Sequence, residues 1–382
     1  MRVYEILVDR FSTGSSAKDA ALRLKTSNAR IGGNLNGVIK KLDYVKDLGF
    51  DAIWLTPIFV SDSYHGYSLL NLHSIDRHFG SDKILYSLVK KAHSLGIKVI
   101  LDFVPNHVSS RHRFFTSARK NPRSRYKDWF FFDEKTKDYM HFLGMRNLVK
   151  LNTMNQDVIN YLIEAALYWI KNFDIDGYRL DHAIGPSMTF WNQFTKECRS
   201  AREDFLLLPE LWTAGIAPQY MNTLWALDDK TLDMLRPVLE KNRDKQWDQI
   251  SEPEGEKLAL SAMKNMFSTS INFVENFYLR KAARSGEVYK PTFEKDFIFA
   301  DNHDMQRISW ITGGDRERVG KAVTSISRTS NSIVYYGTEI GLNQKRDFSK
   351  YKTAPDVECR RFMDWKASDS KAVSDFKTAF RD

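Results

Sequence analysis

The side chains of this chain that are equipped for acid, base or nucleophilic chemistry follow short apolar segments. Four such segments carry them: Asp102, Asn106 and His107 in the first, Arg179 and Asp181 in the second, Glu210 in the third, and His303 and Asp304 in the fourth. A carboxyl group can attack carbon or transfer a proton, and an imidazole can bind hydroxyl groups. Any one of these motifs is ambiguous, because an Asp at a strand end can also cap a helix. Four clusters in succession, each at the end of an apolar segment, favour a catalytic site.

Seven apolar segments rich in Val, Ile, Leu and Phe predict the parallel strands that would position these side chains. They span residues 3–8, 52–56, 97–104, 177–181, 205–210, 297–301 and 332–337. Amphipathic stretches with helical spacing, such as 36–50 and 82–96, lie between them, and the weaker segment 223–227 is a candidate eighth strand. This alternation predicts an α/β fold, the (β/α)8 TIM barrel, whose active sites lie at the carboxyl ends of the strands. A doubly wound open sheet is the alternative, which the strand count and the polar strand ends disfavour.

The chain between the third and fourth predicted strands is too long for a single helix. We therefore predict a catalytic barrel of residues 1–104 and 151–382, with a small subdomain inserted at 105–150. This subdomain contains a basic and aromatic segment at 111–132. Arg beside aromatic rings can stack on nucleic acid bases, stack on sugar rings or pack a small lobe. Of these, we do not expect a nucleic acid partner.

Composition narrows the class of protein. The formal net charge is +9, from 57 Lys and Arg against 48 Asp and Glu, and the excess is spread along the chain as in a basic soluble protein. The two cysteines, Cys198 and Cys359, are too few for a disulfide framework and stand in no metal-binding spacing. No apolar segment approaches the roughly 18 residues of a membrane span, and the N-terminus is strand-like rather than a signal peptide. We expect a cytoplasmic protein with no membrane partner.

A divalent metal centre is the second enzyme hypothesis, since His and carboxylate side chains are common ligands. No His-x-x-x-His or His-x-His pair occurs among these motifs. A metal hydrolase is therefore the weaker prediction.

The same segments resemble the conserved regions of the α-amylase superfamily, glycoside hydrolase family 13. The similarity runs nearly from end to end and includes YEILVDRF, DAIWLTPIF, YHGY, GIKVILDFVPNHV, DGYRLDHA, LPELW, FADNHD, YYGTEIGL and RRFMDW. It implies a (β/α)8 barrel that cleaves α-1,4-glucosidic bonds in starch-like glucans, maltooligosaccharides or cyclodextrins, with retention through a covalent glycosyl-enzyme intermediate. An α-glucan oligosaccharide or polysaccharide is then the expected partner.

The resemblance also implies a role for each residue that matches a family motif. Asp181 becomes the nucleophile, Glu210 the general acid/base and Asp304 the stabiliser of the transition state. The implied substrate-binding residues are His65, Tyr67, Asp102, His107, Arg179 and His303. Among these, Tyr67 would stack on a sugar ring, Asp102 would orient Arg179, and neutral histidines would bind hydroxyl groups. Retention needs one ionised and one protonated carboxyl group, so we expect burial to raise the pKa of Glu210 and Arg179 to keep Asp181 ionised.

Several departures from the family pattern limit what the resemblance implies. Ser68 and Asn71 follow His-Gly-Tyr where many members are acidic, so we expect no carboxylate contact there. Lys150 stands where an Asp often helps to bind calcium, which leaves Asn106 as a lone candidate ligand. We therefore expect no required cofactor. DHAIGPS lacks the Lys-His pair of many endo-acting members, and the C-terminal β-sandwich is expected to be absent or truncated.

Two other functions stay open at the level of the sequence. An α-glucan transglycosylase uses the same covalent intermediate and differs only in its acceptor. A catalytically silent relative that serves as a binding subunit should have lost a catalytic carboxylate, whereas this chain keeps all three. The sequence shows no self-complementary surface that would predict an oligomeric state.

Overall fold

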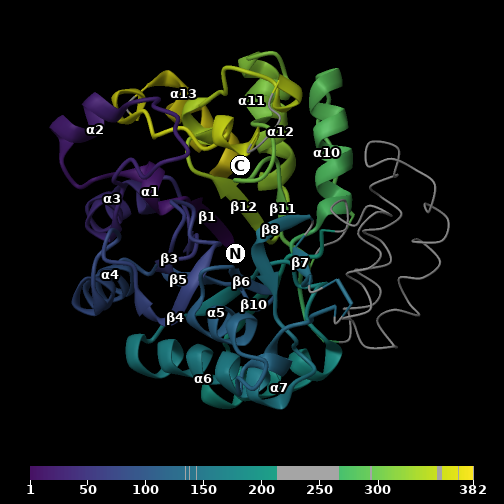
Figure 1. Ribbon diagram of the computed structural model, residues 1–382. Coiled ribbons are helices and arrows are strands. Elements are labelled where there is room, and N and C mark those ends of the chain that lie inside the picture. The colour runs from purple at the N-terminus through teal and green to yellow at the C-terminus, as the bar shows by residue number, and fades with distance from the viewer. Residues whose placement is uncertain are drawn as a thin grey trace. The chain divides into compact units, whose positions relative to one another are not determined.

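The computed structural model describes residues 1–133, 135–136, 138–142, 144–212, 266–292, 295–350, 355–368 and 370–381 (Figure 1). The chain divides into two compact units. The first unit contains Met1–Ile58, Ile75–Leu101 and Glu275–Asp382, and the second contains Phe59–Ser74 and Asp102–Val274. Because each unit joins segments that are distant in sequence, both depend on long-range contacts.

Parallel strands form the base of the first unit. Their hydrogen-bonded order is β5 (Lys98–Phe103, of which the last two residues belong to the second unit), β2 (Ala52–Leu55), β1 (Arg2–Ile6), β12 (Ser332–Tyr335) and β11 (Ile298–Phe299). The register places Glu5 of β1 opposite Trp54 on one side and Tyr335 on the other. Nearly every residue of these strands is buried. That burial explains the continuous apolar segments of the sequence, because a parallel strand covered on both faces has no solvent side.

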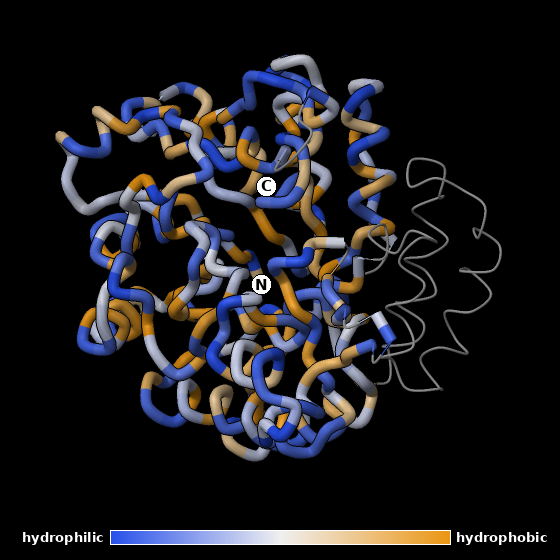
Figure 2. Tube along the Cα trace, in the orientation of Figure 1, coloured by the Kyte–Doolittle hydropathy of each residue, from blue (hydrophilic) through white to orange (hydrophobic). Residues whose placement is uncertain are grey.

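The helices of the first unit are amphipathic, and α3 is typical of them. The Asn34 side chain accepts a hydrogen bond from the Gly37 amide and so begins the helix, while Leu35, Val38 and Leu42 are buried along it. α3 and α4 show both hydrophobic and hydrophilic residues along their turns (Figure 2). α3 packs on α4, and α12 packs on α13. The helix bounds are α1 (Val8–Phe11), α2 (Ser16–Leu22), α3 (Leu35–Asp47), α4 (Asp82–Ser94), α10 (Phe273–Ser285), α11 (Ile308–Ile311), α12 (Arg316–Ser327) and α13 (Lys371–Arg381), with the short 3-10 helices η4 (Thr338–Ile340), η5 (Phe348–Lys350), η6 (Pro355–Glu358) and η7 (Trp365–Ala367).

The second unit contains the parallel pair β9 (Gly177–Leu180) and β10 (Leu206–Pro209), with α6 (Gln156–Phe173) packed on α7 (Met188–Ala201). Gly177 permits the close pairing of these strands, since a Cβ atom there would lie 2.6 Å from the carbonyl oxygen of Leu206. Immediately after β10, Glu210 forms a parallel bridge with Ile271. The strand position that follows β10 is therefore at Ile271.

Two antiparallel sheets complete the second unit. One has the order β6 (His107–Ser109), β8 (Met145–Lys150) and β7 (His141–Phe142), and the other pairs β3 (Phe59–Ser61) with β4 (Leu69–Ile75). The first of these sheets follows β5 in the chain together with α5 (Arg113–Lys120) and η1 (Lys127–Trp129). A three-stranded antiparallel sheet and two short helical segments thus lie between β5 and α6 in the chain.

The aromatic side chains of the basic segment 111–132 pack on one another. Phe115 meets Phe130 and Tyr139 at ring distances of 5.1 and 4.8 Å, and Phe114 meets Trp129 at 4.9 Å. All five rings are buried. Of the three roles considered for this segment, the contacts support the packing of a small lobe.

All seven strands predicted from apolar segments are confirmed, as β1, β2, β5, β9, β10, β11 and β12. The candidate strand at 223–227 lies outside the described residues. The boundaries 105 and 150 of the inserted subdomain stay a prediction.

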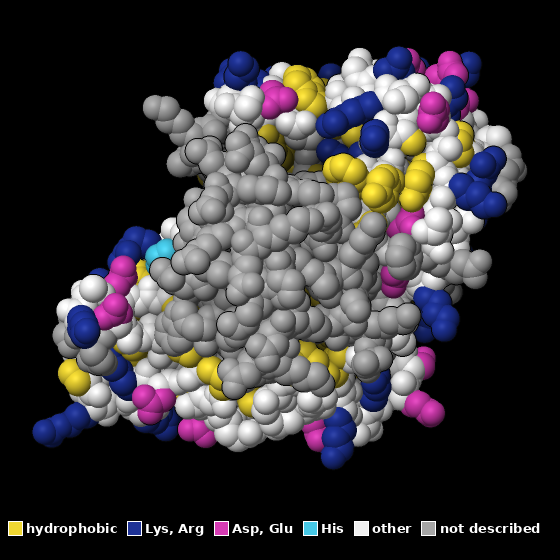
Figure 3. Space-filling model, turned by 90° about the vertical axis from the view of Figure 1, so that its right-hand side faces the viewer, with side chains coloured by type: hydrophobic (Ala, Val, Ile, Leu, Met, Phe, Trp, Pro, Cys, Tyr) yellow, Lys and Arg dark blue, Asp and Glu magenta, His cyan; other side chains and the backbone are white. Residues whose placement is uncertain are grey.

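The described surface carries charges of both signs. In Figure 3, Lys and Arg side chains and Asp and Glu side chains are interspersed on the described surface. Across the described ranges, no helix is both long enough and apolar enough to cross a membrane.

Candidate active site

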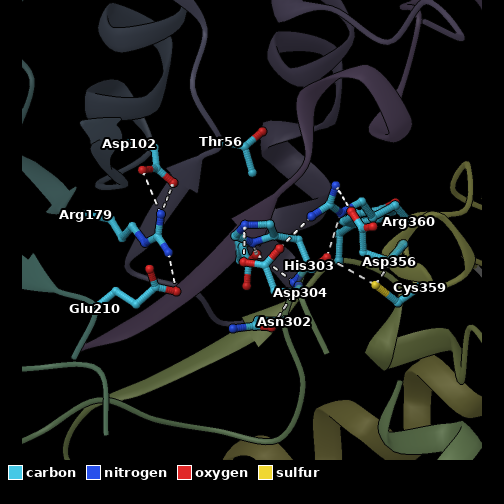
Figure 4. A network of polar contacts seen from close by, with 12 residues as sticks. Thr56, Asp102, Arg179, Glu210, Asn302, His303, Asp304, Asp356, Cys359 and Arg360 are labelled. Atoms are coloured by element: carbon cyan, nitrogen blue, oxygen red, sulfur yellow. Dashed lines mark hydrogen bonds and ion pairs between the residues drawn. The ribbon is translucent and has the colours of Figure 1, made fainter. Parts of the chain in front are cut away.

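Arg179 is the centre of the charged groups in the second unit. It lies on β9 two residues before Asp181, so both side chains point to the same face of the strand. Its Nη1 atom lies 3.0 and 3.1 Å from the two carboxylate oxygens of Asp102 and 2.8 Å from Oδ1 of Asp181. The side chain is fully buried, and it points toward Asp102 and Glu210 in Figure 4. The expected contact between Asp102 and Arg179 is present.

Glu210 binds the same guanidinium through the other terminal nitrogen. Nη2 of Arg179 lies 2.6 Å from Oε1 of Glu210, and the His182 amide donates a hydrogen bond of 2.9 Å to Oε2. The pairing of β9 with β10 brings Glu210 here, because its own amide donates to the carbonyl oxygen of Leu180. One buried cation therefore bridges Asp181 and Glu210.

These neighbours fix the charge of Arg179. Burial alone would lower the pKa of the guanidinium, but the surrounding carboxylates, with Asp102 first among them, raise it well above its usual value. A charged Arg179 favours the ionised form of the carboxylates it touches. For Asp181 this agrees with the predicted role of nucleophile. For Glu210 the cation and the His182 amide oppose the protonation that burial was expected to favour.

His65 and Tyr67 lie in the loop between β3 and β4. The Tyr67 hydroxyl donates to Oδ2 of Asp102 at 2.7 Å, and the Arg179 guanidinium lies 5.7 Å from the centre of the Tyr67 ring. The rings of His65 and Tyr67 are 5.7 Å apart and nearly parallel. The structure thus brings the predicted residues His65, Tyr67, Asp102 and Arg179 into one group with the carboxylates.

Asn106 and His107 lie beside a buried ammonium group. Nζ of Lys150 contacts Oδ1 of Asn106 at 2.5 Å and the carbonyl oxygen of Gly185 at 2.6 Å. The Asn106 side chain lies 3.2 Å from Nδ1 of His107, whose ring stacks on Phe142 at 4.8 Å.

The histidines around this lysine are neutral. Burial, with a smaller contribution from Lys150, lowers the pKa of His107 to about 3. The same two causes lower the pKa of His182 well below its usual value. Burial also lowers the pKa of Lys150, to about 7. These shifts favour the neutral form of His107.

His303 and Asp304 follow β11 in the first unit, where they join Glu5 of β1. Nδ1 of His303 lies 2.6 Å from Oε1 of Glu5, and Nε2 lies 3.0 Å from Oδ2 of Asp304. Burial alone would lower the pKa of His303, but Asp304 and Glu5 raise it to about 10. The expectation of a neutral imidazole is therefore wrong for His303, because two carboxylates flank the ring and keep it protonated.

Arg360 holds the same segment from the C-terminal part of the first unit (Figure 4). Its Nη2 atom lies 2.5 Å from Oδ1 of Asp304, its Nε donates to the carbonyl oxygen of His303 at 2.7 Å, and it pairs with Asp356. The Cys359 thiol lies 3.2 Å from the same His303 oxygen. Asp304 is thus bound on both carboxylate oxygens.

The sequence profile of the family described as "Alpha amylase, catalytic domain" matches residues 5–135 and 131–376. The chain belongs to the α-amylase family. Among its relatives, "Alpha-amylase 2" of Dictyoglomus thermophilum is 33% identical over 90% of this chain and 56% of its own length. "Intracellular maltogenic amylase" of Bacillus subtilis strain 168 is 32% identical over 95% of this chain and 57% of its own length. The chain therefore spans a little over half the length of these relatives.

Solved structures of the α-amylase family share the fold. The α-amylase of Geobacillus thermoleovorans, complexed with acarbose, has a TM-score of 0.71 at 28% identity, over 99% of this chain and 77% of that one. A structure named cyclomaltodextrinase has a TM-score of 0.75 at 25% identity, over 100% of this chain and 61% of that one. The predicted (β/α)8 barrel is confirmed as the fold class.

Calcium, which the family resemblance raised, does not fit the groups around Asn106. The oxygens of Asn106 and Gly185 both accept hydrogen bonds from Lys150, whose ammonium form would repel a second cation. Over the described ranges, no group of three or more His, Cys, Asp or Glu side chains is arranged to hold a metal ion.

Sequence reasoning missed Glu5 and Arg360 as neighbours of the α-amylase motif at His303 and Asp304. A carboxylate inside an apolar predicted strand was the available signal for Glu5, because a buried charge needs a partner. Arg360 belongs to the segment RRFMDW, but nothing in that segment indicates which carboxylate it pairs with.

Proposed function

We propose that the chain is a retaining glycoside hydrolase that cleaves α-1,4-glucosidic bonds in starch-like glucans, maltooligosaccharides or cyclodextrins. The bridge from Arg179 to Asp181 and Glu210 carries this proposal. Two carboxylates bound to one guanidinium suit the short separation of about 5 Å that retaining enzymes use, rather than the wider spacing that admits a water molecule. The names of the relatives, amylase and cyclomaltodextrinase, support an α-glucan substrate.

The proposed reaction has two steps. In the first, an Asp181 oxygen attacks the anomeric carbon while Glu210 gives its proton to the glycosidic oxygen, which leaves as the hydroxyl group of the departing sugar. In the second, Glu210 takes a proton from water, and the water oxygen attacks the anomeric carbon and releases Asp181. Asp304 stabilises the positive charge that develops on the sugar ring in both transition states.

Arg179 has a distinct function in this scheme. Its charge keeps Asp181 ionised for attack, and its bond to Glu210 holds the acid in line with the nucleophile. Glu210 must gain a proton before the first step, against the contacts from Arg179 and the His182 amide. We propose that the proton is taken up as substrate excludes water from the site, because desolvation favours the neutral carboxyl group.

The other predicted site residues are proposed to bind the sugar on the nonreducing side of the cleaved bond. Tyr67 offers a ring face, and His65 and the neutral His107 offer a donor and an acceptor for hydroxyl groups. Lys150 supplies the positive charge beside Asn106, so the proposal includes no metal requirement. We also propose an intracellular location, as the name of the Bacillus subtilis relative suggests.

Transfer to a sugar acceptor is the alternative that the intermediate allows. Hydrolysis and transfer differ only in whether water or a hydroxyl group attacks the covalent intermediate. The silent-relative alternative is disfavoured because Asp181, Glu210 and Asp304 are all present and all bound by cationic neighbours.

Product analysis tests the proposal. The chain is incubated separately with maltoheptaose, a cyclodextrin, pullulan and soluble starch, and the products are separated by chromatography. Shorter maltooligosaccharides released initially as α-anomers are expected, and β-anomers would contradict retention. Products longer than the substrate would show transfer.

Asp181→Asn and Glu210→Gln variants make the test specific. Both should lose activity by several orders of magnitude and remain folded, since each change keeps the size of the side chain. Asp204→Asn is the matched control, because Asp204 pairs with an arginine of the same unit at the surface. Near-normal turnover by either catalytic-site variant would contradict the assignment, as would a loss in the control of similar size.

A further inference from the structure

Glu5 is a carboxylate within a buried strand whose neighbours in the chain are apolar. It is the fourth of the five residues of β1 and is fully buried, with Tyr4 and Ile6 on either side of it in the chain. Its cross-strand neighbours are Trp54 and Tyr335. Burial of a carboxylate is costly unless a cationic or hydrogen-bonding partner compensates. The partner of Glu5 therefore indicates what the residue is for.

That partner is His303. Oε1 of Glu5 lies 2.6 Å from Nδ1 of the imidazole and accepts a second hydrogen bond of 3.3 Å from the His303 backbone amide. Trp54 closes one side of the imidazole with an edge-on ring contact at 5.8 Å. Together these contacts fix both the backbone and the ring plane of His303.

The opposite nitrogen of the ring forms an ion pair with Asp304. Nε2 lies 3.0 Å from Oδ2 of Asp304, whose side chain is more exposed than either partner, at 28%. The series of contacts from Glu5 through His303 to Asp304 thus leads from a buried strand to a carboxylate that solvent can reach. Its inner end is fully buried, whereas its outer end is 28% exposed.

The imidazole of His303 is protonated, so a positive charge lies between the carboxylates of Glu5 and Asp304. The pKa of His303 is raised to about 10, since the two carboxylates outweigh the effect of burial. Arg360 is the other cation here and contacts both Asp304 and the His303 carbonyl. Asp356 offsets Arg360, and the Cys359 thiol faces the same carbonyl with a pKa raised by burial. Tyr335 beside Glu5 is neutral, because burial raises its pKa.

We propose that Glu5 is a positioning residue that acts through His303 to hold the Asp304 carboxylate ionised and in one orientation for the reaction. The inference rests on the proposed function, in which Asp304 stabilises positive charge on the sugar. Glu5 is fully buried, and in this role it acts on Asp304 through His303. Without the Glu5 carboxylate, the imidazole keeps its place but loses its proton at a lower pH, and Asp304 then loses the positive charge of that ring.

Glu5→Gln tests this directly, because the amide keeps the size and the acceptor oxygen but removes the charge. The His303 imidazole is followed by nuclear magnetic resonance of histidine-labelled protein, assigned with His303→Gln. We expect the pKa of His303 to fall by about one pH unit or more in Glu5→Gln. Glu339→Gln is the matched control: Glu339 is equally buried in the first unit, but it binds Tyr4 and Tyr44, so its loss should leave His303 unchanged.

The kinetic test uses α-maltosyl fluoride, whose fluoride leaves without a proton, so that kcat/KM does not depend on an acid. We expect the alkaline limb of the kcat/KM profile of Glu5→Gln to move to lower pH by about one pH unit. The loss should be small at neutral pH, where His303 stays protonated, and should approach about tenfold above about pH 10. In an Asp304→Asn background, Glu5→Gln should have almost no further effect on kcat/KM, because the carboxylate through which Glu5 acts has been removed. A merely structural role would instead give losses that add.

The outcomes distinguish a failure of the Glu5 proposal from a failure of the proposed hydrolase function. An unchanged His303 pKa in Glu5→Gln, or additive kinetic losses in the double variant, would overturn the positioning role while leaving the hydrolase proposal intact. A wild-type chain that cleaves neither the fluoride nor any α-glucan would overturn the proposed function and, with it, the role of Glu5 in that reaction. Glu5→Asp should recover part of the His303 pKa, because it restores the charge at a longer distance.

Discussion

Replacing Arg179 with lysine should damage the protein far more than the same change at Arg202, although both arginines bridge three carboxylates. Arg202 contacts Asp174, Asp176 and Asp204 at 2.9–3.0 Å, but its side chain is 24% exposed and two of the three carboxylates are mostly exposed. The Arg179 side chain is 1% exposed. A lysine presents one point charge in place of a planar fork, so it cannot span all three partners in either cluster.

The magnitudes follow from burial. In Arg179→Lys at least one buried carboxylate loses its cation, which costs about 3–5 kcal/mol of unfolding free energy. In Arg202→Lys the lost contacts are screened by solvent and cost under about 1 kcal/mol. Urea unfolding of both variants measures the difference, and kcat/KM on maltoheptaose should fall by about a hundredfold in Arg179→Lys alone, because the nucleophile and the acid lose their common anchor. Equal losses of stability in the two variants would refute the reasoning that burial determines how much each charged cluster contributes to the free energy of unfolding.

Three further predictions concern other parts of the chain. Treatment with a chelator should change neither the midpoint of thermal unfolding nor the activity. Lys150→Met should lower the midpoint, because it leaves the oxygens of Asn106 and Gly185 without the Lys150 donor. A loss of stability or activity on chelation would contradict the proposal that the Lys150 ammonium group takes the place of a metal ion. Phe115→Ala should cost about 3–5 kcal/mol in urea unfolding, since it removes a fully buried ring from the aromatic lobe. The pKa of His303 is raised in the folded chain, so its stabilising contribution is complete below about pH 6.5 and is lost as the pH rises through about 10. The cost of His303→Gln, measured in urea at successive pH values, should therefore shrink as the pH rises across that range, and a constant cost would show that the ring is not charged.

The strands were predictable because burial on both faces imposes a simple pattern. Each strand of the parallel set is a mostly apolar segment. The residues that directly follow β9 and β10 are the polar Asp181 and Glu210. The strand position at Ile271 was not recognised, because the segment around it, STSINF, is short and polar. There the sheet accepts a single bridge beside Glu210, and no apolar run is needed to form it.

The structure brings predicted residues together within each unit, but their charge states could not be predicted from the sequence alone. Motif order identifies Asp181, Glu210 and Arg179, but charge state depends on which groups meet through space, and sequence spacing does not supply that. Glu210 shows the difference: burial alone suits it to an acid, yet the fold also gives it the Arg179 cation.

His303 and His107 have similar sequence contexts but opposite pKa shifts. Both rings are buried and both follow apolar strands, so their sequence contexts suggest the same neutral imidazole. One lies between two carboxylates and has its pKa raised to about 10, and the other lies beside Lys150 and has its pKa lowered to about 3. Two contributing partners, Glu5 and Lys150, are separated from their histidines by 298 and 43 residues. A single substitution at either partner should therefore alter the chemistry of a histidine without any change in the motif that identifies it.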